Sequence, residues 1–164
     1  MSSRQNRTHR ACLGPVSRGL LVSCLAVGLA GSAAWAQQTP VGLWKTIDDD
    51  GKTVTSLVRI TETAGQLTGV VEKILDPEAK PGDVCEKCSD ERKGKPILGL
   101  TILQKVTHNG DDASLWDGGE ILDPKNGQTY RVRLTPQDGG KALAVRGYIG
   151  MPWIGRTQTW IRVE

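Results

Sequence analysis

Apolar and polar residues alternate in short segments along the last 128 residues of the chain, and clusters of Gly, Asp, Asn and Pro separate these segments. A period of two is typical of β-strands with one buried face, and no long amphipathic helix stands out. In one segment Tyr130, Val132 and Leu134 share a face, opposite Arg131 and Arg133. The pattern predicts eight strands, at residues 42–47, 53–60, 66–74, 96–104, 114–122, 128–135, 141–150 and 155–163.

Asn-Gly and Asp-Gly turns between these segments favour antiparallel hairpins. Each strand and its connection have about 16 residues, the spacing of an antiparallel meander. We therefore predict an all-β fold, an eight-stranded antiparallel up-and-down barrel whose closure removes the edge strands. A two-sheet sandwich is the alternative. One connection, residues 76–95, is polar and about 20 residues long, a length at which loops are commonly functional or disordered.

The first 36 residues differ from the rest, because they contain four Arg, no Asp or Glu, and an apolar run at residues 19–34. Ala34-Trp35-Ala36 then matches the small-x-small pattern that signal peptidase recognises. We predict a signal peptide at residues 1–36, cleavage after Ala36, and a single domain at 37–164 that is periplasmic or secreted. One alternative is an uncleaved anchor helix. Another is a lipoprotein anchored through Cys24, although the apolar run continues well past that residue.

The remaining 128 residues carry all 18 acidic residues and 17 of the 21 Lys and Arg, so their formal charge is −1. A nucleic-acid partner is excluded on this ground, since no excess of cations remains to release counterions. No apolar run of membrane-spanning length follows the leader. The sequence has no Phe and two Tyr, too few aromatic residues for the girdles of an outer-membrane barrel.

Motifs for catalysis or for cofactor binding are not found in the sequence. After cleavage one histidine remains, His108, and the pattern places it in a hairpin turn, where the geometry of a general base is hard to hold. A single histidine also rules out a multi-histidine metal site. We therefore predict no catalytic residues, no metal and no cofactor.

Cys85 and Cys88 form a C-x-x-C pair in the long polar connection. Two ligands do not complete a zinc site, and Ser89 stands where haem attachment requires His. A thioredoxin-like role would need the first Cys at a helix N-terminus. In an oxidising compartment we expect a disulfide that orders the loop, and a redox role stays open as the alternative.

The first and last predicted strands carry a pair of residues with a recurring role. Gly42-Leu43-Trp44 opens the first strand, and Arg162 lies at the end of the last. This arrangement resembles the calycin signature of lipocalins and their relatives. The resemblance implies that Trp44 plugs the closed floor of the barrel and that Arg162 packs across its ring in a cation–π contact.

At a finer level the sequence resembles an exported bacterial family known as domain of unknown function 2147. The family implies a lipocalin-like barrel and an envelope or secreted location, without an established activity. The matching stretches span nearly all of the mature chain: GLWKTIDDDGK (42–52), ERKGKPILGLTIL (91–103), GGEILDPKNGQTYRVRL (118–134), VRGYIG (145–150) and GRTQTWIRV (155–163).

In an up-and-down barrel successive connections alternate between the two ends. Since Trp44 and Arg162 mark one end, the loops near residues 48–51, 76–95, 123–127 and 151–154 should gather at the other. A plugged floor and an elaborate rim suit a ligand-binding barrel. The residues expected to line the cavity are Trp116, Tyr130, Val132, Arg146 and Tyr148, with Trp153 closing the entrance; for Arg146 the alternation fits the interior and solvent equally well.

The leading hypothesis is an exported, non-enzymatic protein that binds a small, partly apolar ligand in its barrel. If Arg146 points inward, that ligand should have an acidic head group, because a buried cation needs an anion. One alternative is an interaction module with a filled barrel. Another is an enzyme that uses rim carboxylates, for which raised carboxylate pKa values would be the sign. The sequence identifies no protein partner.

Overall fold

The computed structural model describes residues 38–164, so the predicted signal peptide, its cleavage site and Cys24 lie outside the described residues. Within this part no helix is long and apolar enough to cross a membrane. The described chain consists of strands and one short 3-10 turn, η1. In chain order the elements are β1 (Gly42–Ile47), β2 (Val54–Thr63), β3 (Gln66–Ile74), β4 (Thr101–His108), β5 (Trp116–Asp117), β6 (Glu120–Asp123), β7 (Gln128–Gln137), η1 (Asp138–Gly140), β8 (Ala142–Tyr148) and β9 (Gly155–Arg162).

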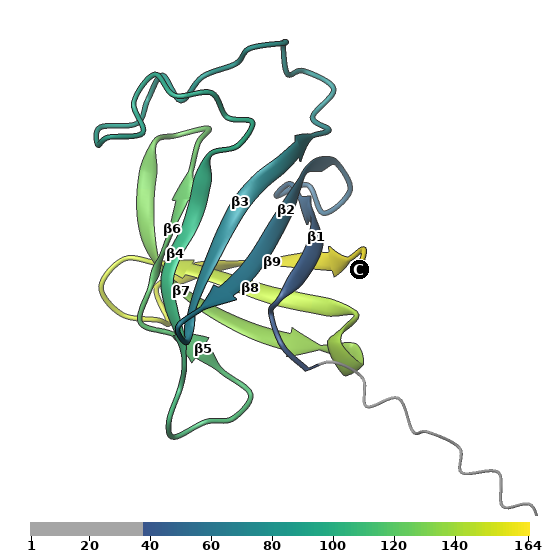
Figure 1. Ribbon diagram of the computed structural model, residues 1–164, viewed down its shortest axis with the longest axis vertical. Coiled ribbons are helices and arrows are strands. Elements are labelled where there is room, and N and C mark those ends of the chain that lie inside the picture. Colours follow the sequence, from purple (N-terminus) through teal and green to yellow (C-terminus); the bar gives the residue numbers. More distant parts are fainter. Residues whose placement is uncertain (1–37) are drawn as a thin grey trace, which may run out of the picture. The chain divides into compact units, whose positions relative to one another are not determined.

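The strands form one antiparallel sheet that closes on itself (Figure 1). From β1 to β4 and from β7 to β9 each strand pairs with the next along the chain, and β1 pairs with β9 to complete the circle. Both β5 and β6 pair with β4 on one side and β7 on the other, so they are two halves of one interrupted strand. The predicted eight-stranded up-and-down barrel is confirmed, and the sandwich alternative is wrong.

The interruption between β5 and β6 falls at Gly118 and Gly119. Gly118 has a φ of +79°, a left-handed conformation that favours glycine. At Gly119 a Cβ atom would lie 2.3 Å from the carbonyl oxygen of Gln104 and 2.5 Å from the backbone nitrogen of Val106. Glycine at both positions therefore lets the strand bend while it stays packed against β4.

The predicted boundaries hold within a few residues except at β4, which was expected at 96–104. The apolar run that suggested this start belongs to the loop, where Pro96 pairs only with Val84 and Gly99 has a φ of +83°. At the other end, Lys105 adopts a positive φ of 59°, which lets the strand continue to His108. His108 is thus the last residue of a strand, not part of a turn.

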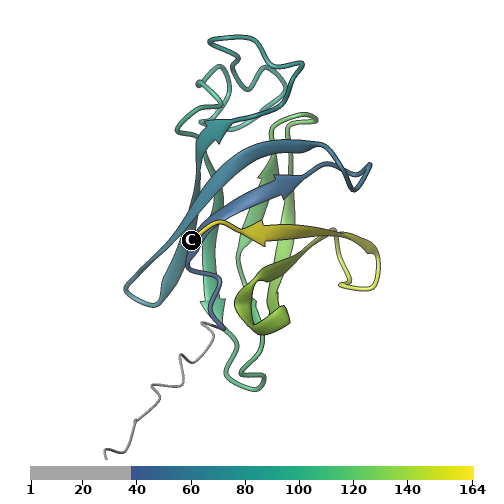
Figure 2. The ribbon, with the colours of Figure 1, turned by 90° about the vertical axis from the view of Figure 1, so that its right-hand side faces the viewer.

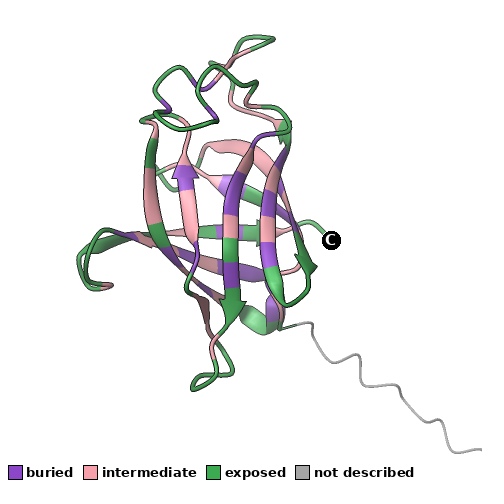
Figure 3. Cartoon of the chain, turned by 60° about the vertical axis from the view of Figure 1, so that its left-hand side comes forward, coloured by how far each residue is buried: buried purple, intermediate pink, exposed green. Residues whose placement is uncertain are grey.

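Buried and exposed residues alternate along the strands, while the loops are mostly exposed (Figure 3). The buried side chains make one continuous core, which reaches from Trp44 at the floor to Cys85 and Cys88 in the loop between β3 and β4. Its members come from every long strand and include Val58, Ile60, Leu67, Leu103, Val106, Val132, Leu134 and Leu143.

The floor of the barrel is built around Trp44, whose side chain is fully buried. The guanidinium carbon of Arg162 lies 4.2 Å from the centre of the Trp44 ring, so the cation–π contact that the sequence predicted is present. The same guanidinium donates hydrogen bonds to the carbonyl oxygens of Val41 (2.7 Å), Thr39 (2.5 Å) and Gly140. Trp44 itself donates from Nε1 to the carbonyl oxygen of Pro40 at 2.7 Å.

Replacing Trp44 with Ala should lower the free energy of unfolding by about 3–5 kcal/mol, because the change empties the packed floor and leaves Arg162 without its ring. Urea unfolding followed by circular dichroism measures this. Trp153→Ala is the matched control, since 73% of that side chain is exposed, and it should change the value by less than about 0.5 kcal/mol. Equal losses in the two variants would contradict the assignment of Trp44 to the floor.

Candidate functional site

The half of the barrel above the floor contains a cavity of about 890 Å³. Its lining includes residues from four loops, which we call the rim: 48–53 between β1 and β2, 75–100 between β3 and β4, 124–127 between β6 and β7, and 149–154 between β8 and β9. These are the loops that the alternation of connections predicted at one end. Figure 2 shows the 75–100 loop next to the 124–127 turn, against which it packs.

Carboxylates and cations from different rim loops form ion pairs at the mouth of the cavity. Lys125 Nζ lies 2.8 Å from Asp48 Oδ2 and 3.2 Å from Asp76 Oδ2, and so joins three rim loops. Arg156, at the start of β9, pairs with Asp49 and lies 3.7 Å from Asp123. The hydrogen bond from Lys125 lowers the pKa of Asp48, and Asp48 in turn raises the pKa of Lys125.

One wall of the cavity carries hydroxyl groups. Thr46 Oγ1 lies within hydrogen-bond distance of Thr55 Oγ1 (2.7 Å) and Ser56 Oγ (2.8 Å). The two neighbours on β2 share this wall because of a β-bulge: Thr46 pairs with Ser56 and Ile47 with Val54, which leaves Thr55 as an extra residue. A bulge of this kind redirects a side chain that strict alternation would point away. The alternating pattern alone gave no sign of it.

The opposite wall is aliphatic, and the base of the cavity is aromatic. Its apolar lining residues come from β3, β4, β6, β8 and the long rim loop, and include Val71, Ile74, Ile97, Ile102, Ile121, Leu122 and Val145. At the base lies Trp160, which is almost fully buried and donates from Nε1 to Gln158 Oε1 at 3.3 Å. The cavity therefore has an apolar interior, one polar wall and a charged mouth.

Of the six residues expected to line the cavity, Tyr130 and Tyr148 do so. The hydroxyl of Tyr130 accepts a hydrogen bond from Asn126 Nδ2 at 3.1 Å, which ties it to the rim. Val132, the next inward-facing residue on β7 towards the floor, is fully buried and belongs to the packed core below the cavity.

Trp116, Arg146 and Trp153 do not line the cavity, and the structure corrects these three expectations. Trp116 lies on β5 towards the floor end, in edge contact with His108 at 4.7 Å between ring centres. Arg146 lies on β8 between two lining residues, and donates hydrogen bonds instead to the carbonyl oxygen of Pro152 (2.6 Å) and to Thr157 Oγ1 (2.9 Å). Its charge gives no reason for an acidic head group on a ligand.

Trp153 projects from the 149–154 loop with 73% of its side chain exposed, so it does not cover the entrance in this structure. Its neighbours Ile149 and Ile154 do line the cavity and are also exposed, as is Met151. The apolar sequence of this loop predicts an apolar surface. Which of its side chains points into the cavity depends on the turn closed by the hydrogen bond from the Ile154 N–H to the Met151 carbonyl oxygen.

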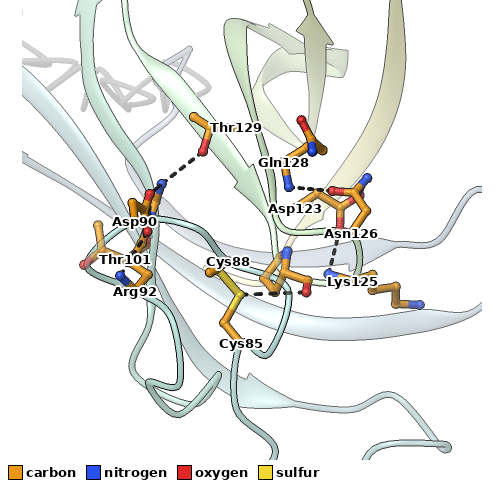
Figure 4. Close-up of a disulfide and its surroundings, with 11 residues drawn as sticks. Cys85, Cys88, Asp90, Arg92, Thr101, Asp123, Lys125, Asn126, Gln128 and Thr129 are labelled. Carbon is orange, nitrogen blue, oxygen red and sulfur yellow. Dashed lines mark hydrogen bonds and ion pairs between the residues drawn. A yellow bond between two sulfur atoms is a disulfide. The ribbon is translucent and has the colours of Figure 1, made fainter.

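The long rim loop is ordered around the predicted disulfide between Cys85 and Cys88, which the structure contains (Figure 4). Both cysteines are buried, at 0% and 2% exposure, and they join the apolar core. The loop also packs against the 124–127 turn: a Cβ atom on Gly127 would lie 2.1 Å from the Lys87 carbonyl oxygen. Burial of the disulfide and this close packing hold part of the rim against the barrel.

Arg92 anchors the end of the same loop. Its guanidinium is nearly buried, pairs with Asp90, and donates to Thr129 Oγ1 on β7 at 3.0 Å (Figure 4). The hydrogen bonds from Arg92 lower the pKa of Asp90 to about 2. The pair stays ionised at neutral pH, and sequence reasoning did not single it out because Asp90 and Arg92 resemble ordinary solvated loop residues.

Among residues 38–164 no group of three or more His, Cys, Asp and Glu side chains is placed to hold a metal ion. The pKa of the rim carboxylate Asp48 is lowered, whereas the alternative of an enzyme that uses rim carboxylates predicted raised pKa values.

Comparison with known proteins agrees with this architecture. The family described as "Uncharacterized protein conserved in bacteria (DUF2147)" matches residues 42–162. The fold is similar to the solved structure of HP1028 from the human pathogen Helicobacter pylori, which is described as belonging to the lipocalin family. That match has 19% identity and a TM-score of 0.63, and covers 76% of this chain and 82% of that one. No curated protein matches the sequence significantly.

Replacing both Cys85 and Cys88 should destabilise the protein while the barrel stays folded. Cys85→Ala with Cys88→Ala should lower the free energy of unfolding by about 2 kcal/mol, because the closed loop is short. Cys85→Ser with Cys88→Ser should cost about 1–3 kcal/mol more, since two hydroxyls would replace buried sulfur. Urea unfolding compares the two double variants, and identical losses would contradict burial of the two positions in an apolar environment.

Proposed function

We propose that this chain, which belongs to the DUF2147 family and has a lipocalin-like fold, is an exported, non-enzymatic protein that binds a small, partly apolar ligand in its barrel. The observation that carries the proposal is the cavity of about 890 Å³ above a plugged floor. Ligand sites in proteins are typically concave, about 300–1,000 Å³ in volume, and mostly apolar with a few polar groups.

The combination of a wide cavity towards the rim and a plugged floor supports binding over a purely structural role. Unfilled apolar space reduces stability, so a barrel that served only as a scaffold would gain by filling it. The hydroxyls of Thr46, Thr55 and Ser56 provide hydrogen-bonding groups on one wall, which suits a ligand with a polar portion. The cavity therefore favours ligand binding over the alternative of an interaction module with a filled barrel.

The 149–154 loop favours a second role beside the first, namely contact with another macromolecule. Ile149, Met151, Trp153 and Ile154 are all more than half exposed. Adjacent exposed apolar residues commonly mark a contact surface. Since Ile149 and Ile154 also line the cavity, such a contact would occur at its mouth.

Filling the cavity should abolish binding of a neutral apolar probe. Gly147 lines the cavity on β8, where an added Cβ would be in ordinary contact with Tyr130 at 3.5 Å. Gly147→Phe should therefore be accommodated and should weaken binding of N-phenyl-1-naphthylamine at least about tenfold, as measured by fluorescence titration.

Gly110→Phe is the matched control, because Gly110 lies in the loop between β4 and β5 with open space around it. That variant should bind the probe as the unchanged protein does. If the two variants bind it equally well, the probe is not in the cavity and the proposed function loses its main support.

Export should be visible in the mass of the protein recovered from its own bacterium. We expect a chain that begins at Gln37 and carries no lipid, because Ala34-Trp35-Ala36 fits a signal peptidase site. Intact-mass spectrometry measures this directly. Ala36→Arg should leave residues 1–36 attached, since signal peptidase requires a small residue there. A mass that includes an acylated Cys24 would overturn the prediction in favour of a lipoprotein.

A further inference from the structure

The mouth of the cavity carries an excess of negative charge. Among the described lining residues there are two cationic side chains, Lys125 and Arg156, against six carboxylates: Asp48, Asp49, Asp76, Glu78, Asp83 and Asp123. These residues come from all sides of the mouth, namely from the loops 48–53 and 75–100, the β6–β7 turn and the start of β9. A cleft bordered by one sign of charge and walled by apolar side chains concentrates ligands of the opposite sign.

The two cations are already engaged. Lys125 lies between Asp48 and Asp76, at 2.8 and 3.2 Å, and Arg156 lies between Asp49 and Asp123. Each cation is thus shared by two carboxylates, so an anionic head group at the mouth would have to compete with two protein carboxylates for either one. A cationic head group would instead meet carboxylates whose charge a single cation only partly balances.

The carboxylates at the mouth combine charge with partial shielding from solvent. The pKa of Asp48 is lowered by its hydrogen bond from Lys125. The side chains of Asp76 and Asp123 are only 19% and 24% exposed, so their interactions with a nearby charge are less screened than those of fully exposed carboxylates.

Directly below the mouth the walls become aliphatic, with Ile74, Ile97 and Ile121 facing the cavity, and the base is Trp160. We infer that the ligand is a cationic amphiphile, with its ammonium group among the mouth carboxylates and its apolar tail in the barrel. This inference rests on the proposed function, because it names the ligand class of the same cavity. It replaces the acidic head group that an inward Arg146 would have implied.

Three amphiphiles with the same alkyl chain test the charge preference: decylammonium, decanol and decanoate. Each displaces N-phenyl-1-naphthylamine from the intact protein at neutral pH, below the concentration at which it forms micelles. Decylammonium should bind at least about tenfold more tightly than decanoate, with decanol between them. The preference should shrink as salt is raised, because these charges are partly exposed.

A pair of charge variants locates the effect. Asp48→Asn with Asp76→Asn removes two carboxylates from the mouth and leaves Lys125 without both partners. The preference for decylammonium over decanoate should fall about tenfold or reverse. Asp111→Asn with Asp112→Asn makes the same change in net charge in the β4–β5 loop at the floor end, and should leave the preference unchanged.

Failure of the inference and failure of the proposed function give different results. If the neutral probe binds in the cavity but decanoate binds as tightly as decylammonium or more tightly, the cationic ligand class is wrong and the binding function stands. A preference that changes equally in both double variants would show a net-charge effect and would also overturn the inference. If neither the probe nor any amphiphile binds, the proposed function fails and the inference fails with it.

Discussion

The contact between Arg162 and Trp44 fixes the organisation of the rest of the barrel. The strand that must close the circle, β9, is in register with β1 at only two residue pairs, Trp44 with Arg162 and Lys45 with Ile161. Arg162 strengthens this short pairing by covering the Trp44 ring and by donating hydrogen bonds to three carbonyl oxygens. One of these belongs to Gly140, in the η1 turn that precedes β8. Burial lowers the pKa of this guanidinium, and the carbonyls compensate for the water it has lost.

Because Trp44 and Arg162 close the floor, the side chains that point into the barrel change along β1 and β9 from apolar near the floor to polar or charged near the rim. Along β9 the side chains run from Trp160 through Gln158 to Arg156, and all three line the cavity. Along β1 they run from the buried Trp44 to Thr46, whose hydroxyl belongs to the polar wall. The gradient follows from solvent access, since a charged group away from water needs compensating partners such as those that Arg162 has. It also makes the cavity amphipathic, the property on which both proposals depend.

Sequence reasoning gave the strand order and the end at which the unusual loops lie, because both follow from periodicity and the parity of connections. The position of the floor came from the resemblance to the calycin signature. It failed where a local irregularity changes the face that a residue occupies. The bulge at Thr55 and the positive φ of Lys105 are such irregularities, and neither leaves a periodic signal. The orientations of Arg146 and Trp153 depend on hydrogen bonds within a single loop, which alternation does not describe.

Apart from the buried disulfide, the rim is stabilised largely by polar interactions, because apolar side chains that packed across the mouth would fill the cavity. Ion pairs through Lys125 and Arg156 join loops that are far apart in sequence. The long loop between β3 and β4 is too long to be ordered by a turn alone, and the buried Cys85–Cys88 disulfide orders part of it. Such interactions across a solvent-facing mouth contribute less than core packing does. Apolar packing around the floor therefore contributes more to the stability of the barrel than the interactions of the rim do. The charged residues at the mouth can consequently determine which ligand binds without being needed for folding.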